Sequence, residues 1–339
     1  MSAATLTPPL FDLPEVRQGV AAEGGERWVS PLRYPGGKAR MAPALGHIFD
    51  RQISPILDIE VWIEPFAGGA GAGLWLLDRG WIDSFWMVER NHALATFWDT
   101  ATTRGDVLAS RVEALAPTMS DWHWAREAVQ ASAGGQDPNP LDLALAAFLL
   151  NRLSRSGIVH PRVGPIGGKH QAGRWKIGDR FNGPALAERI RRVASLGDSI
   201  TVHETDAIGY IEELPGSGVE HEVFLFVDPP YIVEGNGLYA HGMDLDDHAR
   251  LAAALRACPA PWLLTYDDHP AVLDLYPQER ILEYAIPHTA NTRGIGREWA
   301  VLSPYTAATD DLMLLPKGEV SWVREDAGEA PPWPVEMVG

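Results

Sequence analysis

The 339-residue chain has one cysteine, Cys258, and no long apolar segment. A single cysteine excludes an intrachain disulfide and a thiolate cluster for structural zinc. No apolar run approaches the length of a membrane span, and the opening MSAATLTPPLFDLPEV lacks a basic region followed by an apolar one. We therefore expect a cytoplasmic protein without a signal peptide or a membrane anchor.

Basic residues are also scarce, since 28 Lys and Arg stand against 45 Asp and Glu, for a net charge of −17. Such a balance argues at first against a nucleic-acid partner, which usually meets a basic surface. The charge is unevenly distributed, however. Residues 151–192 hold ten basic and two acidic residues, a balance of +8, whereas the remainder holds 18 basic and 43 acidic residues, or −25. Taken alone, the basic segment fits either a solvated face or a phosphate-binding surface.

Histidines late in the chain do not indicate a metal site. Their spacings match no common zinc pattern, and we expect no bound metal. These residues are His241, His248, His269 and His288.

Short apolar runs rich in β-forming residues alternate with helical patterns. The expected strands are 61–66, 84–89, 199–204, 223–228, 261–266, 280–286 and 298–303, and the expected helices are 71–79, 91–101, 245–257 and 270–275. Such alternation predicts an α/β fold with βαβ units and a mainly parallel sheet covered by helices on both faces. The almost continuously hydrophobic run VFLFV is typical of a strand buried on both sides.

The alternation breaks once, between residues 103 and 198, where a helical stretch leads into the Gly-rich basic segment. We place an inserted domain there, within a main domain that comprises residues 29–102 and 199–315. Residues 1–28 and the tail 316–339 are rich in Pro, Gly and Glu, and we expect both to be mobile or draped over the surface.

A glycine-rich turn, IEPFAGGAGAG, joins the first expected strand to its helix. Glycines at 68, 69, 71 and 73 allow a sharp turn and a close approach of backbone to ligand, as at the nucleotide sites of α/β sheets. Leucines at 74 and 76 do not fit G-x-G-x-x-G, which disfavours a dinucleotide, and no G-K-[ST] makes it a P-loop.

Two further motifs have both a functional and a structural interpretation. Glu89, in MVERN, lies 21 residues beyond Gly68 at a strand end, where it could bind ribose hydroxyls or cap the helix that starts near Asn91. Lys38, in RYPGGKAR, could meet a ligand carboxylate or belong to an ordinary loop.

The sequence VDPPY ends the strand 223–228, because two prolines cannot continue a hydrogen-bonded ladder. It also suits chemistry on the exocyclic amine of a heteroaromatic base. Asp228 and the carbonyl of Pro229 can accept from the two N–H groups, Pro230 stiffens the turn, and Tyr231 offers a face for a flat base.

In the order RYPGGK, EPFAGGAG and DPPY, these motifs resemble the Dam-like family of S-adenosylmethionine-dependent DNA adenine-N6 methyltransferases, the D12 class of phages and bacteria. LLNRLSRSGI and GPIGGKHQAGRWKIGDRFN are similar to the inserted target-recognition region of that family. The resemblance runs from about Arg33 to Tyr305. It implies a Rossmann-like, mainly parallel, seven-stranded methyltransferase sheet with helices on both faces. It also implies a smaller target-recognition insert made mostly of helices and loops.

The resemblance also implies roles for individual residues. Asp228, Pro229, Pro230 and Tyr231 would form the catalytic motif that holds the target adenine. The methyl donor, S-adenosyl-L-methionine, would contact Tyr34, Lys38, Glu64, Pro65, Phe66, Gly68, Gly69, Glu89, Asp206 and Asp228. Two positions depart from the common pattern: Tyr34 stands where many relatives have tryptophan, and Glu89 where many have aspartate.

The basic segment then supplies a surface for DNA, because an enzyme that extrudes a base must hold a distorted duplex by its phosphates. The candidate contacts are Asn151, Arg152, Arg155, Arg162, Lys169, Arg174, Lys176 and Arg180. We expect a monomer or weak dimer that methylates adenine N6 in double-stranded DNA. A donor-binding but catalytically silent DNA-binding protein and an RNA N-methyltransferase stay open as alternatives, as does membership of a restriction-modification system.

Overall fold

The computed structural model describes residues 30–34, 38–52, 59–136, 138–232, 242–288, 294–307 and 320–326. Its centre is an eight-stranded sheet in the order β3-β2-β1-β4-β5-β7-β6-β8. The strands are β1 (Val61–Glu64), β2 (Ser84–Val88), β3 (Ile200–His203), β4 (Val223–Val227), β5 (Trp262–Asp267), β6 (Arg280–His288), β7 (Gly294–Leu302) and β8 (Val320–Arg324). Strands β1 to β5 are parallel, whereas β7 runs antiparallel to both β5 and β6, and β8 antiparallel to β6.

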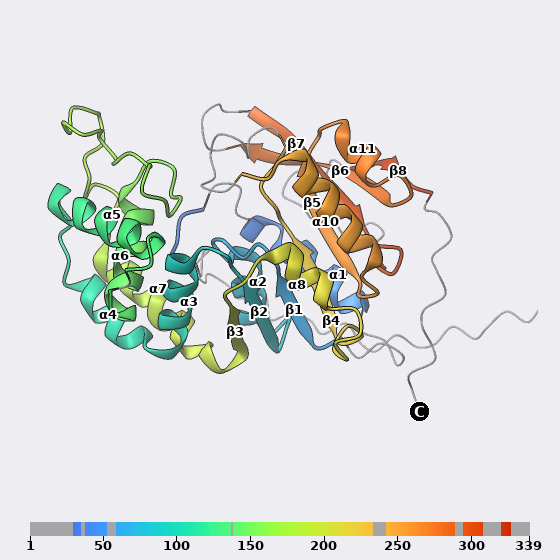
Figure 1. The fold of residues 1–339 in the computed structure, drawn as a ribbon, viewed down its shortest axis with the longest axis horizontal. Helices are drawn as coiled ribbons and strands as arrows, with labels where there is room; N and C mark the ends of the chain where they lie inside the picture. Colours follow the sequence, from blue (N-terminus) through green and yellow to red (C-terminus); the bar gives the residue numbers. More distant parts are fainter. Residues whose placement is uncertain are drawn as a thin grey trace, which may run out of the picture.

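Helices connect most of the strands (Figure 1). Around the sheet they are η1 (Lys38–Arg40), α1 (Ala42–Gln52), α2 (Gly71–Asp78), α3 (His92–Thr103), η2 (Gly197–Ser199), α8 (Ala207–Glu213), α10 (Leu245–Ala257) and α11 (Ala271–Leu275). Four more, α4 (Gly105–Glu113), α5 (Met119–Ala133), α6 (Pro140–Leu153) and α7 (Gly183–Ser195), lie between α3 and β3 in the chain.

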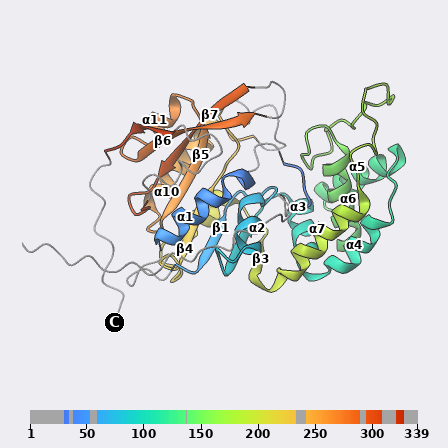
Figure 2. The same ribbon diagram turned by 180° about the vertical axis from the view of Figure 1, so that it is seen from behind.

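Both faces of the parallel sheet are buried, as continuous hydrophobic strands require. Side chains alternate between the faces, so Trp62 and Phe224 point into a core shared with α1, α2 and α3. Ile63 and Leu225 point into a second core, formed with α8, α10 and α11. The view from behind in Figure 2 shows α1 and α2 on the first face. The α/β fold class predicted from the sequence is confirmed.

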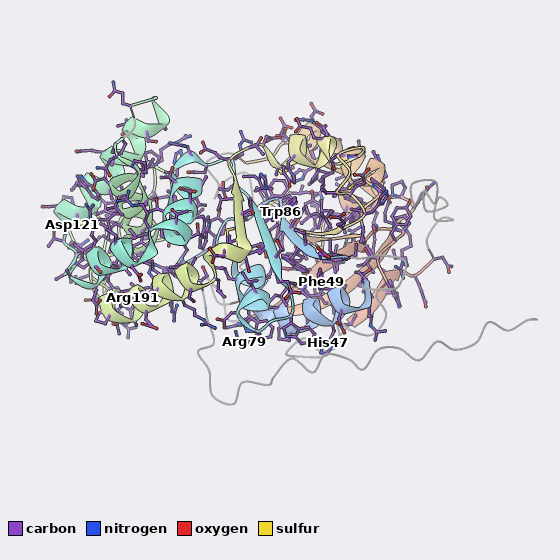
Figure 3. The ribbon with its side chains drawn as sticks, turned by 90° about the horizontal axis from the view of Figure 1, so that it is seen from below. His47, Phe49, Arg79, Trp86, Asp121 and Arg191 are labelled. Atoms are coloured by element: carbon purple, nitrogen blue, oxygen red, sulfur yellow. The ribbon has the colours of Figure 1, made fainter. Side chains whose placement is uncertain are left out.

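Helices α4 to α7 form a bundle to one side of the sheet (Figures 1 and 3). Its apolar residues continue the core of α3, because the Phe97 ring stacks on that of Phe148 with centroids 5.8 Å apart. An ion pair between Arg192 of α7 and Asp78 of α2 also crosses from the bundle to the sheet. The bundle therefore does not form a core separate from that of the sheet.

All seven predicted strands occur, with ends that differ by a few residues. The tail was predicted wrongly in part, because Val320–Arg324 pairs with β6 as an eighth strand, and Trp322 packs against the core. Helices α1, α4, α5, α7 and α8 were not predicted. Within the described ranges, no helix has the length and apolarity needed to cross a membrane.

Candidate active site

The candidate site lies at the carboxyl ends of β1 and β4, where the strand order of the sheet reverses. From β1 the chain proceeds to β2 and β3 on one side, and then returns to β4 and β5 on the other. Val61 pairs with Val223 and Ile63 with Leu225, and continuing this register brings Phe66 level with Asp228. Ligands of open α/β sheets bind at this kind of reversal, because the loops diverge there and leave a crevice.

The turn after β1 is held in a conformation that suits small residues. Gly68 has a φ of 48° and Ala70 a φ of 47°, both in the left-handed region. A Cβ atom on Gly68 would lie 2.8 Å from the Tyr34 ring, and one on Gly69 would lie 2.7 Å from Tyr34 Cβ. The sharp glycine turn predicted after β1 is therefore present, and the Tyr34 side chain packs against it.

Glu89 links this turn to the end of β2. Its carboxylate accepts hydrogen bonds from the backbone N–H of Gly68 at 3.1 Å and of Asn91 at 2.8 Å. The cap of α3 is the Asn91 side chain, which accepts from the N–H of Leu94. Burial raises the pKa of Glu89 to about 6, against the opposing effect of these hydrogen bonds. Glu89 thus holds the two loops together and is only 9% exposed.

Glu64 lies beneath the glycine turn. Its side chain is 5% exposed and accepts from the N–H of Gly73 at 2.6 Å and the Trp62 indole at 3.2 Å. It therefore ties the start of α2 to β1, and its contact with a methyl donor stays a prediction. Burial raises the pKa of Glu64 to about 7, with a further contribution from the negative charge of Asp228.

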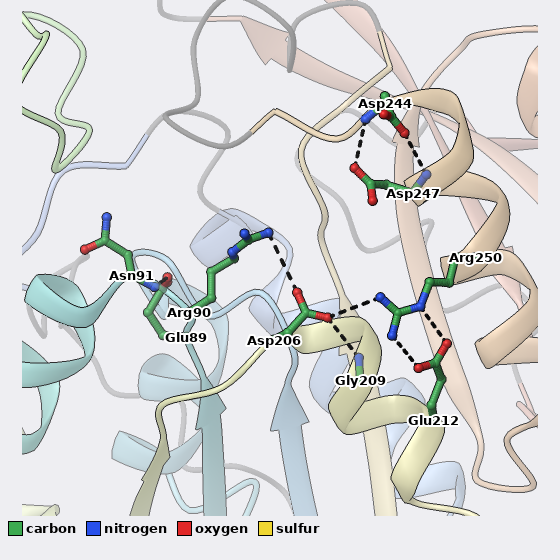
Figure 4. Close-up of polar contacts among 9 residues, drawn as sticks. All are labelled: Glu89, Arg90, Asn91, Asp206, Gly209, Glu212, Asp244, Asp247 and Arg250. Carbon is green, nitrogen blue, oxygen red and sulfur yellow. Dashed lines mark hydrogen bonds and ion pairs between the residues drawn. The ribbon is translucent and has the colours of Figure 1, made fainter. Parts of the chain in front are cut away.

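Asp206 and Arg90 lie at the outer edge of this region (Figure 4). The Asp206 carboxylate caps α8 by accepting from the N–H of Gly209 at 3.0 Å. It lies 3.7 Å from Arg90 and 3.9 Å from Arg250, and Arg250 also pairs with Glu212. Asp206 is thus near Glu89 along the sheet edge and remains accessible, with its side chain 43% exposed.

At the end of β4, Asp228 is held by two side chains from distant parts of the chain. Lys38 of η1 donates to both carboxylate oxygens, at 2.8 and 3.0 Å. The Thr265 hydroxyl, in the carboxyl-terminal half of the neighbouring strand β5, donates to Oδ1 at 2.7 Å. The Asp228 side chain is 25% exposed, whereas that of Lys38 is 3% exposed. The structure therefore brings two predicted site residues, Lys38 and Asp228, into direct contact.

A second carboxylate, from Glu298 of β7, lies behind this pair. It is 3.7 Å from Lys38 Nζ and accepts a hydrogen bond of 2.8 Å from the Tyr284 hydroxyl of β6. Burial lowers the pKa of Lys38, but the charges of Asp228 and Glu298 outweigh it, and the net effect is a raised pKa. Neither Thr265 nor Glu298 was predicted from the sequence. Thr265 could have been found as a polar residue near a strand end, but Glu298 depends on the antiparallel course of β7.

The remaining residues of the motif continue from Asp228 at the same edge. Pro229 is buried and Pro230 partly buried. The Tyr231 ring lies below Lys38, whose Nζ is 5.0 Å from the ring centroid. The Tyr231 hydroxyl is buried, and within the described part of the chain it has no hydrogen-bond partner. Burial, with the charges of Asp228 and Glu298, raises its pKa well above the usual value.

Two of the predicted DNA contacts are less exposed than expected. Asn151 is 0% exposed; it accepts from the N–H of Arg33 and donates to the carbonyl groups of Arg33 and Gly157. It is therefore a structural residue, and the prediction was wrong. Arg152 is only partly exposed, and burial, followed by the charges of Arg33 and Arg189, lowers its pKa to about 10. The other six cations are exposed: Arg155, Arg162, Lys169, Arg174, Lys176 and Arg180.

The described part of the chain contains no group of three or more His, Cys, Asp or Glu side chains arranged to hold a metal ion. His248 lies in the second core, where its Nδ1 is 2.7 Å from the Tyr266 hydroxyl. Burial lowers its pKa. His241 lies outside the described residues, as do residues 35–37 of the RYPGGK motif.

No protein-family model and no curated protein matches the chain. Two solved structures of rRNA methyltransferase aviRa from Streptomyces viridochromogenes do. One is 17% identical over 85% of this chain and 95% of that chain, with a TM-score of 0.36. The other is 15% identical over 89% of this chain and 99% of that chain, with a TM-score of 0.34. Likenesses this loose assign neither an activity nor a substrate to the chain.

Proposed function

We propose that the chain is an S-adenosylmethionine-dependent methyltransferase that acts on N6 of adenine in double-stranded DNA, with the target base turned out of the helix. The observation that carries the proposal is the position of Asp228. Asp228, whose carboxylate would accept a hydrogen bond from the substrate amine, directly follows β4. It therefore lies beside the glycine turn after β1, where the strand order reverses. A donor and an acceptor bound to these two loops would be neighbours.

The residues around the glycine turn fit a donor with a ribose and an adenine. Glu89 retains lone-pair positions for ribose hydroxyls, because a carboxylate has about four of them and backbone N–H groups of Gly68, Arg90 and Asn91 occupy no more than three. Asp206 would accept from the donor's adenine, and Tyr34 and residues 65–69 would enclose its methionine part. S-adenosylmethionine, when bound, supplies an electrophilic methyl group.

At the acceptor side, the protein's task is orientation. The lone pair of an exocyclic amine is delocalised into the ring, so acceptors on its two N–H groups must turn it toward the methyl group. Asp228 Oδ2 and the Pro229 carbonyl would serve as these acceptors, while Thr265 and Lys38 fix the carboxylate. The Tyr231 ring would offer a flat face to the target base.

DNA is the substrate that the charge distribution and the DPPY motif favour. Six exposed cations gather between residues 155 and 180, in a chain that is otherwise strongly acidic. Phosphate contacts of this kind would hold a duplex while one base is extruded, at a cost of a few kcal/mol for unstacking.

The test is methyl transfer from labelled donor to duplex DNA and to RNA of equal sequence, with wild type and Asp228→Ala. We expect labelled DNA with wild type and at least about 100-fold less with the variant. Preferential labelling of RNA would replace the substrate but keep the chemistry. Donor binding by calorimetry with no labelling of any nucleic acid would instead support the catalytically silent protein.

A further inference from the structure

The structure describes two exposed tryptophans, Trp124 of α5 and Trp175 of the basic segment. Trp175 is 46% exposed and lies between two arginines of the same loop. The guanidinium carbons of Arg174 and Arg180 are 5.3 and 5.2 Å from its ring centroid. An exposed aromatic side chain in contact with two cations is the combination that sequence-tolerant nucleic-acid sites use, because every base offers a flat π-face next to a phosphate.

The loop that carries Trp175 is built around close backbone contacts. A Cβ atom on Gly167 would lie only 2.6 Å from the carbonyl oxygen of Trp175, and Gly167 has a φ of 83°. The N–H of Gly173 donates to the carbonyl of Gly167 at 3.0 Å. A residue larger than glycine at 167 would therefore displace the loop segment that presents Trp175.

Gln171 is the internal support of this loop. Its side-chain amide donates to the carbonyls of Ile166 at 2.7 Å and Gly168 at 2.8 Å, and its oxygen accepts from the N–H of Ile177 at 2.8 Å. Ile166 and Ile177 are buried on either side. Trp175 is thus exposed on a hydrogen-bonded platform, so ordering the loop would cost little on binding.

We propose that Trp175 is a base-stacking residue: its indole packs against an unstacked nucleobase while the neighbouring arginines contact the adjoining phosphates. This role was not assigned by the sequence analysis, which considered only the charges of the segment. It rests on the proposed function, because that function requires a nucleic acid with one base out of the helix. Charge complementarity selects a nucleic acid as the partner: the segment from 155 to 180 holds one acidic residue, Asp179, beside its six exposed cations.

The experiment compares Trp175→Ala, Trp175→Phe and the control Trp124→Ala, whose residue is 40% exposed on α5. Fluorescence anisotropy gives the affinity for an intact duplex and for a duplex with one bulged adenine, over a range of salt. We expect Trp175→Ala to weaken binding of the bulged duplex by about 5-fold to about 100-fold, the range of a lost stacked base. Trp175→Phe should retain most of the wild-type affinity for the bulged duplex, and Trp124→Ala should leave that affinity unchanged.

The salt dependence separates stacking from charge. Trp175→Ala removes no cation, so the slope of log affinity against log salt should stay as in wild type, whereas Arg174→Ala should reduce it by about one. With 2-aminopurine as the bulged base, wild type and Trp175→Phe should quench its fluorescence and Trp175→Ala should not.

Equal affinity and equal quenching for Trp175→Ala and wild type would overturn the proposal. The proposal would also be overturned if Trp175→Ala lost binding to anionic lipid vesicles that wild type binds, while its affinity for both duplexes stayed unchanged. If wild type binds and quenches but transfers no methyl group to any nucleic acid, the stacking role stands and the proposed function fails.

Discussion

Lys38 Nζ lies 2.8 Å from Asp228 Oδ1, although the two residues are 190 positions apart in the chain. The ion pair joins the segment before β1 to the end of β4. Because Lys38 is 3% exposed, its charge is compensated inside the protein by Asp228 and Glu298. The pair therefore fixes the position of the Asp228 carboxylate and also stabilises the fold.

Replacing Lys38 tests how much the ion pair contributes to the stability of the fold. Lys38→Met leaves two carboxylates near one another without their common partner, and we expect it to lower the free energy of unfolding by about 2–4 kcal/mol. The value is below that of a fully buried pair, because the Asp228 side chain is 25% exposed. Urea unfolding measures it.

The control for this change is Lys169→Met, which removes an exposed lysine from the basic segment. Adding Asp228→Asn to Lys38→Met should recover part of the lost stability, because it removes one of the uncompensated charges. A Lys38→Met protein as stable as Lys169→Met would contradict the importance of the pair.

Glu298 should act as a positioning residue through Lys38. Glu298→Gln can still accept the hydrogen bond of Tyr284 but no longer competes for the ammonium group. We expect kcat to fall about tenfold with little change in the KM for the donor, because the Lys38–Asp228 geometry shifts while the donor loops stay intact. Steady-state methyl transfer measures both constants.

Glu283→Gln makes the same chemical change on the neighbouring strand, where Glu283 pairs with Arg297, and should leave kcat unchanged. Equal kcat values for Glu298→Gln and wild type would remove Glu298 from the site.

The sequence revealed the strands and the loops at their ends because both depend on local patterns. Alternation identified β1 to β7, and the residues after β1, β2 and β4 were found from their chemistry. Contacts that depend on tertiary structure were missed. Glu298 approaches Lys38 only because β7 runs antiparallel between β5 and β6. Asn151 is polar and stands beside arginines in the sequence, yet its hydrogen bonds to Arg33 and Gly157 keep it buried.

Donor affinity should rise with pH if Glu89 accepts ribose hydroxyls. Its pKa in the free protein is about 6, raised by burial, and hydrogen bonds from the donor favour the ionised form. Binding should therefore release a proton near this pH, and affinity should increase as the pH rises toward and past 6. Calorimetry in buffers of different ionisation enthalpy detects the proton. Glu89→Gln should bind more weakly and without this dependence; an affinity that is flat across the same range in wild type would disagree.

Glu64 should make the fold less stable at alkaline pH. Its pKa is raised from 4.5 to about 7, so the protonated form is the one that the folded state favours. This stabilising contribution is present below pH 4.5 and is lost as the pH rises through about 7. Glu64→Gln resembles the protonated form, and we expect it to exceed wild type by about 2–3 kcal/mol above that range and to match it at acidic pH. A constant difference between the two proteins at all pH values in urea unfolding would refute the assignment.

The central claim is that Asp228 directs methylation of adenine in DNA. Its most direct test is a map of modified bases in the DNA of cells that express the wild-type chain, the Asp228→Ala variant or neither. We expect N6-methyladenine within a defined sequence in the first sample alone. Unmodified adenine in the wild-type sample, or the same modification in the Asp228→Ala sample, would contradict it.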